Sequence, residues 1–74
     1  MSELGPHTPN PILRHFSYAH LPTPAMRSVS ERFFFLAHIL DGSLPNGPEK
    51  SVALRKLLES KDAAVRAALD EEAV

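Results

Sequence analysis

One uninterrupted run of helix-forming residues, which begins at Gly47, most constrains what this chain can fold into. Between Pro48 and Leu69 it contains no glycine and no further proline, and it is rich in Ala, Leu, Glu, Lys and Arg, which have high helix propensity. Proline is tolerated at the first helical position because its missing N–H would be unpaired there. The pattern predicts a helix over residues 47–72, about 38 Å long at the α-helical rise. A protein of this size cannot cover a helix of that length, and we therefore expect part of the helix to face another chain.

A second helix is predicted before it, with two candidate starts. Thr23 can act as the N-cap with Pro24 at the first helical position, or Ser28 can begin a capping box that Glu31 completes. The start at Thr23 is favoured because it aligns six apolar residues on one stripe: Met26, Val29, Phe33, Leu36, Ala37 and Leu40. We expect this helix to end near Asp41, where Gly42 would supply the left-handed stop.

The short connection between the two helices predicts their arrangement. Residues 42–47 are rich in turn-forming types, and a loop of this length normally joins antiparallel neighbours. Residues 1–22 are predicted to be an N-terminal arm, with a short helical turn around Pro11 to His15 followed by an extended piece. The predicted fold is therefore all-α: the arm, then an antiparallel helical hairpin over residues 23–74 with helices at about 23–41 and 47–72.

Three consecutive phenylalanines favour assembly into a homo-oligomer. Phe33, Phe34 and Phe35 together span about 200° of a helix, whereas one partner helix covers a stripe of about 100°. An exposed Phe beside Ile39 would form an apolar patch of the kind found at interfaces. The later helix adds a wide apolar seam: Val52, Ala53, Leu57, Ala64 and Ala68, flanked by Leu54, Leu58, Val65 and Leu69. The chain has no cysteine, so disulfides cannot stabilise so small a fold.

Charge and hydropathy exclude several classes of partner. A net charge of −1 and a pI near 6.4 argue against binding to DNA or RNA polymers, although a few converging cations could still hold a small anion. No apolar run approaches the length of a membrane span, and the first residues lack the features of a signal peptide. We therefore expect an intracellular protein with no membrane partner.

Catalytic and metal-binding signatures are missing from the sequence. It contains no phosphate-binding loop, no GxSxG, no HExxH and no thiol, and it has no HxxxH or HxxH pair of histidines. The four histidines could supply a general base, but histidines more often have packing or capping roles. They are His7, His15, His20 and His38. The acidic residues of the later helix, among them Glu71 and Glu72, are expected to form a solvated face. We expect no catalytic residue, no cofactor and no metal.

Cations and one aromatic residue are the remaining candidates for a binding site. Arg66 lies among Ala, Val and Leu, where a charge is costly unless it is paired, so either a bound phosphate or an ion pair would account for it, with Glu59, Asp62 or Asp70 as the partner and Asp62 at the i, i+4 spacing. Tyr18, beside Arg14 and His15, could stack on a base or could serve as a core or interface residue.

Two segments carry a resemblance to a known family. The runs NPILRHFSYAHLP (residues 10–22) and GPEKSVALRKLLESKDAAVRA (residues 47–67) resemble the helical-hairpin domain shared by phage anti-CBASS and Thoeris anti-defence sponges. The likeness extends from about Asn10 to Leu69. It implies a non-enzymatic homo-oligomer, typically a hexamer, that sequesters cyclic di- and trinucleotides between protomers without cleaving them. Such a sponge would block CBASS-type signalling in the cytoplasm of the host bacterium.

The resemblance also implies roles for individual residues. Tyr18 matches a tyrosine that stacks on a base, and Arg66 matches an arginine that holds phosphate in the cyclic trinucleotide pocket. The family's cyclic dinucleotide pocket uses a lysine on the first helix, where this chain has Arg32 as the candidate substitute. Our hypothesis is that Arg66 and Lys61 contact phosphates while Tyr18 and the arm contact bases. The alternative is a structural or protein-interaction hairpin with no nucleotide ligand.

Overall fold

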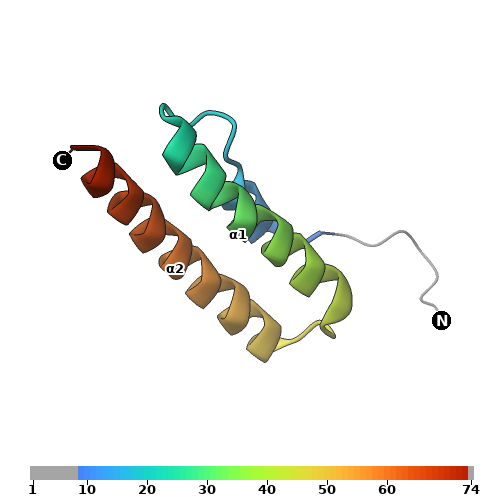
Figure 1. Cartoon of the computed structure of the whole chain (residues 1–74). Helices are drawn as coiled ribbons and strands as arrows, with labels where there is room; N and C mark the ends of the chain where they lie inside the picture. Colours follow the sequence, from blue (N-terminus) through green and yellow to red (C-terminus); the bar gives the residue numbers. More distant parts are fainter. Residues whose placement is uncertain (1–8, 74) are drawn as a thin grey trace.

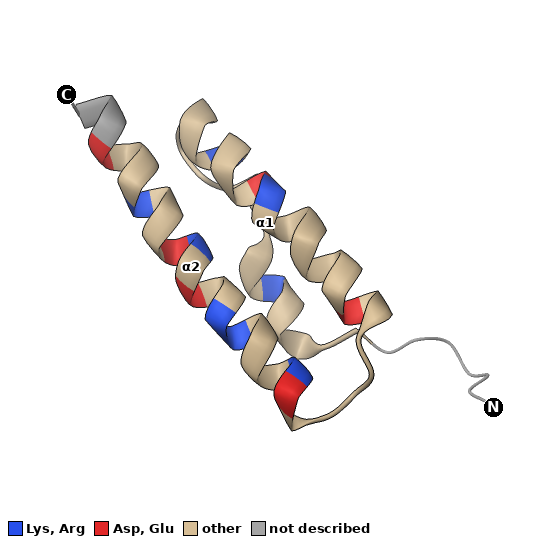
Figure 2. Cartoon of the chain, turned by 60° about the horizontal axis from the view of Figure 1, so that its bottom comes forward, with Lys and Arg blue, Asp and Glu red and all other residues tan. Residues whose placement is uncertain are grey.

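Two long antiparallel helices and one short helix make up the described chain. The computed structural model describes residues 9–73, with only the backbone for residues 71–73. Its elements are the 3₁₀ helix η1 (Pro11–Phe16), α1 (Pro24–Ser43) and α2 (Pro48–Ala73) (Figure 1). The all-α helical hairpin is therefore confirmed, and η1 lies against both long helices (Figure 2). The first part of the predicted arm, including His7, and the side chains of Glu71 and Glu72 lie outside the described residues.

The start of α1 follows the prediction. The Thr23 hydroxyl accepts a hydrogen bond of 3.1 Å from the Met26 N–H, and Pro24 occupies the first turn. Arg27 in the next turn donates from Nη1 to the Leu21 carbonyl at 2.7 Å, which fastens the chain that enters the helix. Ser28 lies inside α1, so the competing start at the capping box is wrong.

The end of α1 differs from the prediction. The helix runs through Gly42 to Ser43, and Gly47 is the glycine with positive φ among the described residues, at 158°. A left-handed stop is unnecessary because other donors satisfy the last carbonyl groups. The Ser43 hydroxyl donates to the Ile39 carbonyl at 2.6 Å and the Leu44 N–H to the Leu40 carbonyl at 2.9 Å.

The core consists of two apolar clusters along the hairpin. Buried Leu13, Phe16, Ala37 and Leu54 form the first cluster, and Met26, Val65 and Ala68 form the second. Phe16 and Leu54 have no exposed surface, and both clusters gain half-buried neighbours. The Ser30 hydroxyl is also fully buried, and it has no hydrogen-bond partner in the described part of the chain.

The arm contributes to this core through η1. The predicted helical turn over Pro11 to His15 is confirmed and extends by one residue to Phe16. Because a 3₁₀ helix has three residues per turn, Leu13 and Phe16 fall on one face, and both are buried. Asn10 caps this helix by accepting a hydrogen bond of 3.0 Å from the Ile12 N–H. The arm is thus packed against the hairpin from Asn10 onward.

Several apolar residues remain uncovered in the single chain. Phe35 and Ile39 are 53% and 62% exposed, which confirms the prediction that a phenylalanine and Ile39 are exposed together. Leu36, which the predicted stripe placed inward, is 42% exposed, and Leu69 of the predicted seam is 47% exposed. We call Phe35, Leu36 and Ile39 the α1 patch. No helix within residues 9–73 combines the length and hydropathy needed to cross a membrane.

Candidate functional site

Tyr18 follows η1 and packs on the middle of α1. Its carbonyl accepts a hydrogen bond of 3.1 Å from the Leu21 N–H, which closes a turn before α1. The Tyr18 ring meets the Phe34 ring edge to face, with centroids 5.2 Å apart. Phe34 also contacts Phe35 at 5.3 Å and His38 at 4.4 Å, so Tyr18 joins a cluster of four rings. Tyr18 is half-buried, which leaves part of the ring accessible.

Arg14 and His15 lie in the last turn of η1 and are both exposed. Leu13 and Phe16 lie on the buried face of η1, whereas Arg14 and His15 lie on its exposed face. The Ser17 hydroxyl donates to the Arg14 carbonyl at 3.2 Å, which closes the end of η1. The structure therefore places both side chains on the same segment as Tyr18, as the sequence suggested, and leaves them available to a ligand.

Arg66 is more exposed than its apolar sequence context suggested, whereas Lys61 is largely covered. Arg66 is exposed, and its side chain makes no ion pair or hydrogen bond with the described residues. The predicted pair with Asp62 is wrong because Asp62 contacts Lys61 instead, at 3.1 Å. The Lys61 side chain is only 12% exposed. In the single chain Arg66 is thus the more accessible cation, and the apolar residues around it in sequence do not bury it.

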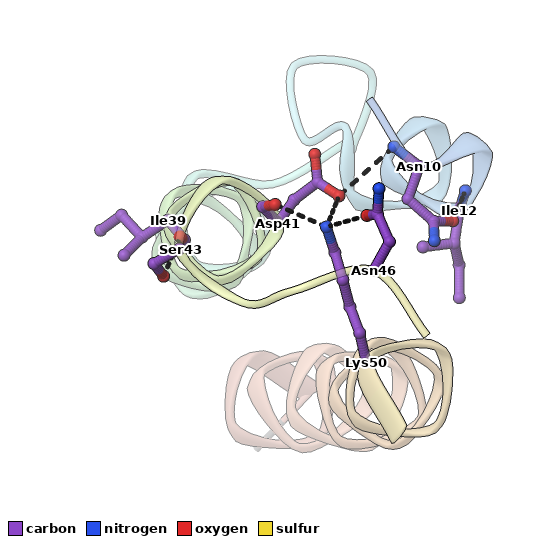
Figure 3. Close-up of polar contacts among 7 residues, drawn as sticks. All are labelled: Asn10, Ile12, Ile39, Asp41, Ser43, Asn46 and Lys50. Atoms are coloured by element: carbon purple, nitrogen blue, oxygen red, sulfur yellow. Dashed lines mark hydrogen bonds and ion pairs between the residues drawn. The ribbon is translucent and has the colours of Figure 1, made fainter. Parts of the chain in front are cut away.

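Arg32 lies beside the α1 patch. It is exposed, and with Phe33 and Leu36 it lines an open hollow of about 230 Å³ on α1. Between Arg32 and Asp41 the α1 ribbon carries no charged residue (Figure 2). Ile39 projects from α1 on the side away from Asp41 (Figure 3). Arg32 therefore lies at the edge of a largely apolar surface, which also carries the exposed His38.

The predicted site residues do not converge on one point of the chain. Tyr18 packs on Phe34, whereas Arg66 follows Val65, which packs with Met26. Phe34 and Met26 are eight residues apart on α1, which corresponds to about 12 Å along the helix axis. Within one chain Tyr18 and Arg66 are therefore associated with different parts of α1, and a second copy of the chain could bring the two residue types to one ligand.

A buried ion pair near the hairpin loop was missed by the sequence reasoning. Lys50 Nζ lies 3.1 Å from Asp41 Oδ1, and both side chains are 3% exposed. The same ammonium donates to the Asp41 carbonyl at 2.6 Å and to Asn46 Oδ1 at 3.0 Å (Figure 3). Lys50 lies in the first turn of α2, where a cation opposes the helix dipole. That unfavourable position was the available signal that Lys50 has a specific partner.

The same carboxylate reaches the arm. Asn10 N–H donates to Asp41 Oδ1 at 3.4 Å, so Asp41 contacts the arm as well as Lys50 (Figure 3). The polar network therefore connects the arm, α1, the loop and α2.

No group of three or more side chains suited to holding a metal ion occurs within the described part of the chain.

Comparison with known protein families, curated proteins and solved structures finds no match to this chain. The likeness of residues 10–22 and 47–67 to the anti-defence sponges therefore stays a prediction from sequence.

Proposed function

We propose that this chain is a phage immune-evasion sponge, which binds cyclic di- or trinucleotides between protomers without cleaving them and so blocks CBASS-type signalling in the host bacterial cytoplasm. The observation that carries the proposal is the exposed guanidinium of Arg66, which makes no ion pair or hydrogen bond with the described residues. An arginine without a carboxylate partner is suited to holding a phosphate by two parallel hydrogen bonds.

Assembly of several copies would complete the site. The α1 patch is uncovered in the single chain, and contiguous exposed apolar surface of this kind is typical of interfaces. Because Tyr18 and Arg66 lie near different parts of α1, whose contact residues Phe34 and Met26 are about 12 Å apart along the helix axis, we assign a pocket that uses both to residues from two protomers. Symmetry would also repeat Arg66 around an axis, which suits a cyclic ligand with several phosphates.

The remaining candidates divide between bases and phosphates. Tyr18, Arg14 and His15 share one segment and would contact the bases, since aromatic and guanidinium planes both stack on nucleobases. Arg32 is the candidate cation for a cyclic dinucleotide pocket, with the hollow beside it as a wall. Lys61 is largely covered by its own chain, so we assign it a supporting role through Asp62.

Titration calorimetry with cyclic di- and trinucleotides tests the assignment. Arg66→Ala is expected to weaken trinucleotide binding about 10- to 150-fold, which corresponds to a lost hydrogen bond to a charged group. Tyr18→Leu should cost about 5- to 150-fold if the ring stacks on a base. The matched control is Arg55→Ala, which removes another exposed cation from α2 and should change the affinity less than twofold. Unchanged affinity of oligomeric Arg66→Ala for every ligand would refute the site.

Recovery of the ligand separates a sponge from an enzyme. After incubation and denaturation, intact cyclic ligand is expected in the supernatant, and a linear product would contradict the proposal.

Arg32→Ala is expected to affect cyclic dinucleotides only, because Arg32 is assigned to that pocket alone.

The α1 patch also supports a second candidate, a protein-interaction hairpin without a nucleotide ligand. This candidate predicts a stable complex with a different protein and no cyclic nucleotide released from the denatured, freshly purified chain. Mass spectrometry of that supernatant distinguishes the two functions.

A further inference from the structure

The segment from Asn10 to Tyr18, which we call the strap, crosses the hairpin and ends at the candidate base-stacking residue. Its apolar anchors, Leu13 and Phe16, lie in the core. The hydrophobic driving force is non-directional, whereas a hydrogen bond has a defined geometry. A polar contact between the strap and a long helix therefore adds a sharper constraint on where the strap lies than the packing of these two side chains alone.

The one such contact to a long helix among the described strap residues is at Asp41. The Asn10 N–H donates to Asp41 Oδ1, and the Asn10 side chain in turn caps η1 through the Ile12 N–H. Asn10 therefore connects the carboxylate to the first turn of the strap helix (Figure 3). The Leu13 N–H donates to the Asn10 carbonyl at 3.0 Å, which adds a second bond from this helix to Asn10.

Lys50 fixes the carboxylate from the other side. Its ammonium contacts Asp41 through both the carboxylate and the backbone carbonyl, and Asn46 takes a further bond. Both charged side chains are almost completely buried, so neither is available to a ligand. Replacement of a buried ion pair by apolar residues is often neutral for stability, so the contribution of the pair to geometry can be measured separately.

We propose that Asp41 and Lys50 are positioning residues: by fixing Asn10 they set where η1 begins and therefore where Tyr18 lies on Phe34. Leu13 and Phe16 attach the strap to the hairpin, and the ion pair sets the position of the strap along the hairpin. The effect on Tyr18 is indirect, because Tyr18 lies eight residues beyond Asn10 and contacts neither charged residue.

Replacing both charges by apolar residues separates positioning from stability. The variant Asp41→Leu/Lys50→Met leaves no unpaired buried charge, and such replacements often preserve or raise stability. Amide hydrogen exchange of the unliganded protein is measured at Ile12 and Leu13 in the strap and at Ala37 and Leu54 in the hairpin. We expect strap protection to fall at least tenfold while hairpin protection changes less than threefold. Equal changes in both regions, or no change in the strap, would overturn the proposal.

The matched control removes an exposed ion pair from the same helix. Lys56 and Glu59 lie 3.9 Å apart with side chains 68% and 61% exposed, so Lys56→Met/Glu59→Leu should leave strap protection unchanged. A strap response equal to that of the buried-pair variant would count against a specific role for Asp41 and Lys50.

A second pair of variants tests the contact without touching the buried charges. Asn10 has φ of −65°, which proline also adopts, so Asn10→Pro removes the N–H without backbone strain. Asn10→Ala removes the cap but keeps the N–H. We expect the Leu13 amide to exchange at least threefold faster in Asn10→Pro than in Asn10→Ala. Equal exchange would show that the bond to Asp41 does not hold the strap.

A binding measurement, which rests on the proposed function, extends the test to Tyr18. The affinity for a cyclic trinucleotide should fall at least fivefold in Asp41→Leu/Lys50→Met, and this loss should vanish when Tyr18 is already Leu. A loss that persists without Tyr18 would overturn the indirect route. Because the exchange experiments use no ligand, they decide the positioning role even if the protein binds no nucleotide.

Discussion

Replacement of Ile39 by Asp tests whether the α1 patch forms an interface between copies of this chain. Ile39 is 62% exposed and projects away from the hairpin core (Figure 3). The change should leave the fold of the single chain almost unaffected, within about 0.5 kcal/mol, since surface substitutions rarely do more. A large effect on association would therefore report the interface alone.

The exposed fraction of Ile39 sets the size of the expected effect. Complete burial of an isoleucine side chain contributes about 1.5–3 kcal/mol. Covering the 62% that remains exposed would thus contribute about 1–2 kcal/mol per copy. At a two-fold symmetric contact the residue occurs twice, so its loss costs about 2–4 kcal/mol, or about 30- to 1,000-fold in the dissociation constant. Desolvation of the new carboxylate adds to this figure.

Sedimentation equilibrium over a range of protein concentrations measures the dissociation constant directly. The control is Ser60→Asp, which places the same charge at an exposed position of α2 outside the patch. Thermal unfolding followed by circular dichroism confirms that both variants are folded. A change of less than twofold for Ile39→Asp, or an equal change for Ser60→Asp, would refute the interface at this patch.

Three further changes test the packing of the fold by chemical denaturation. Leu54→Ala removes a side chain with no exposed surface and should cost about 2–5 kcal/mol in the free energy of unfolding. Leu69→Ala, at a 47% exposed position, should cost much less. Similar losses in the two variants would contradict the assigned core. Thr23→Ala should cost about 1 kcal/mol through loss of the α1 cap, and Thr23→Ser, which keeps the hydroxyl, should recover most of it; equal stability of the two variants would show that the hydroxyl does not stabilise α1. Ser30→Ala should stabilise the chain by about 1–3 kcal/mol, because it deletes a buried hydroxyl that lacks a partner in the described residues; a loss of stability would contradict an unsatisfied hydroxyl at this position.

Local signals in the sequence predicted most of the fold. The Thr23 and Pro24 pair marked the start of α1 because capping depends on a few adjacent residues. The absence of glycine and proline after Pro48 marked α2 in the same way. Gly42 misled the prediction of the helix end, since the carbonyl of Asp41 is satisfied by Lys50 in the next helix. A contact across the loop is invisible to rules that use neighbouring residues alone.

The candidate site was less predictable than the fold. The sequence placed Tyr18 near Arg14 and His15, and the structure keeps them on one segment. The exposure of Arg66 and the burial of Lys61 could not be foreseen, because the rotation of α2 against α1 decides which cation faces inward. The role of Asp41 was also hidden, since it depends on Asn10, which lies 31 residues earlier in the chain.

The complete burial of Phe16 has a consequence for how the chain is made. η1 leaves the ribosome before either long helix, yet the cluster that buries Phe16 includes Leu54 of α2. At about 5–20 residues per second, synthesis reaches Leu54 about 2–8 s after Phe16. Throughout that interval the nascent chain carries an uncovered Phe16, and for about the second half of it also the three phenylalanines of α1. Chaperones that bind short apolar segments therefore have a window of seconds, which closes once the first turns of α2 have emerged.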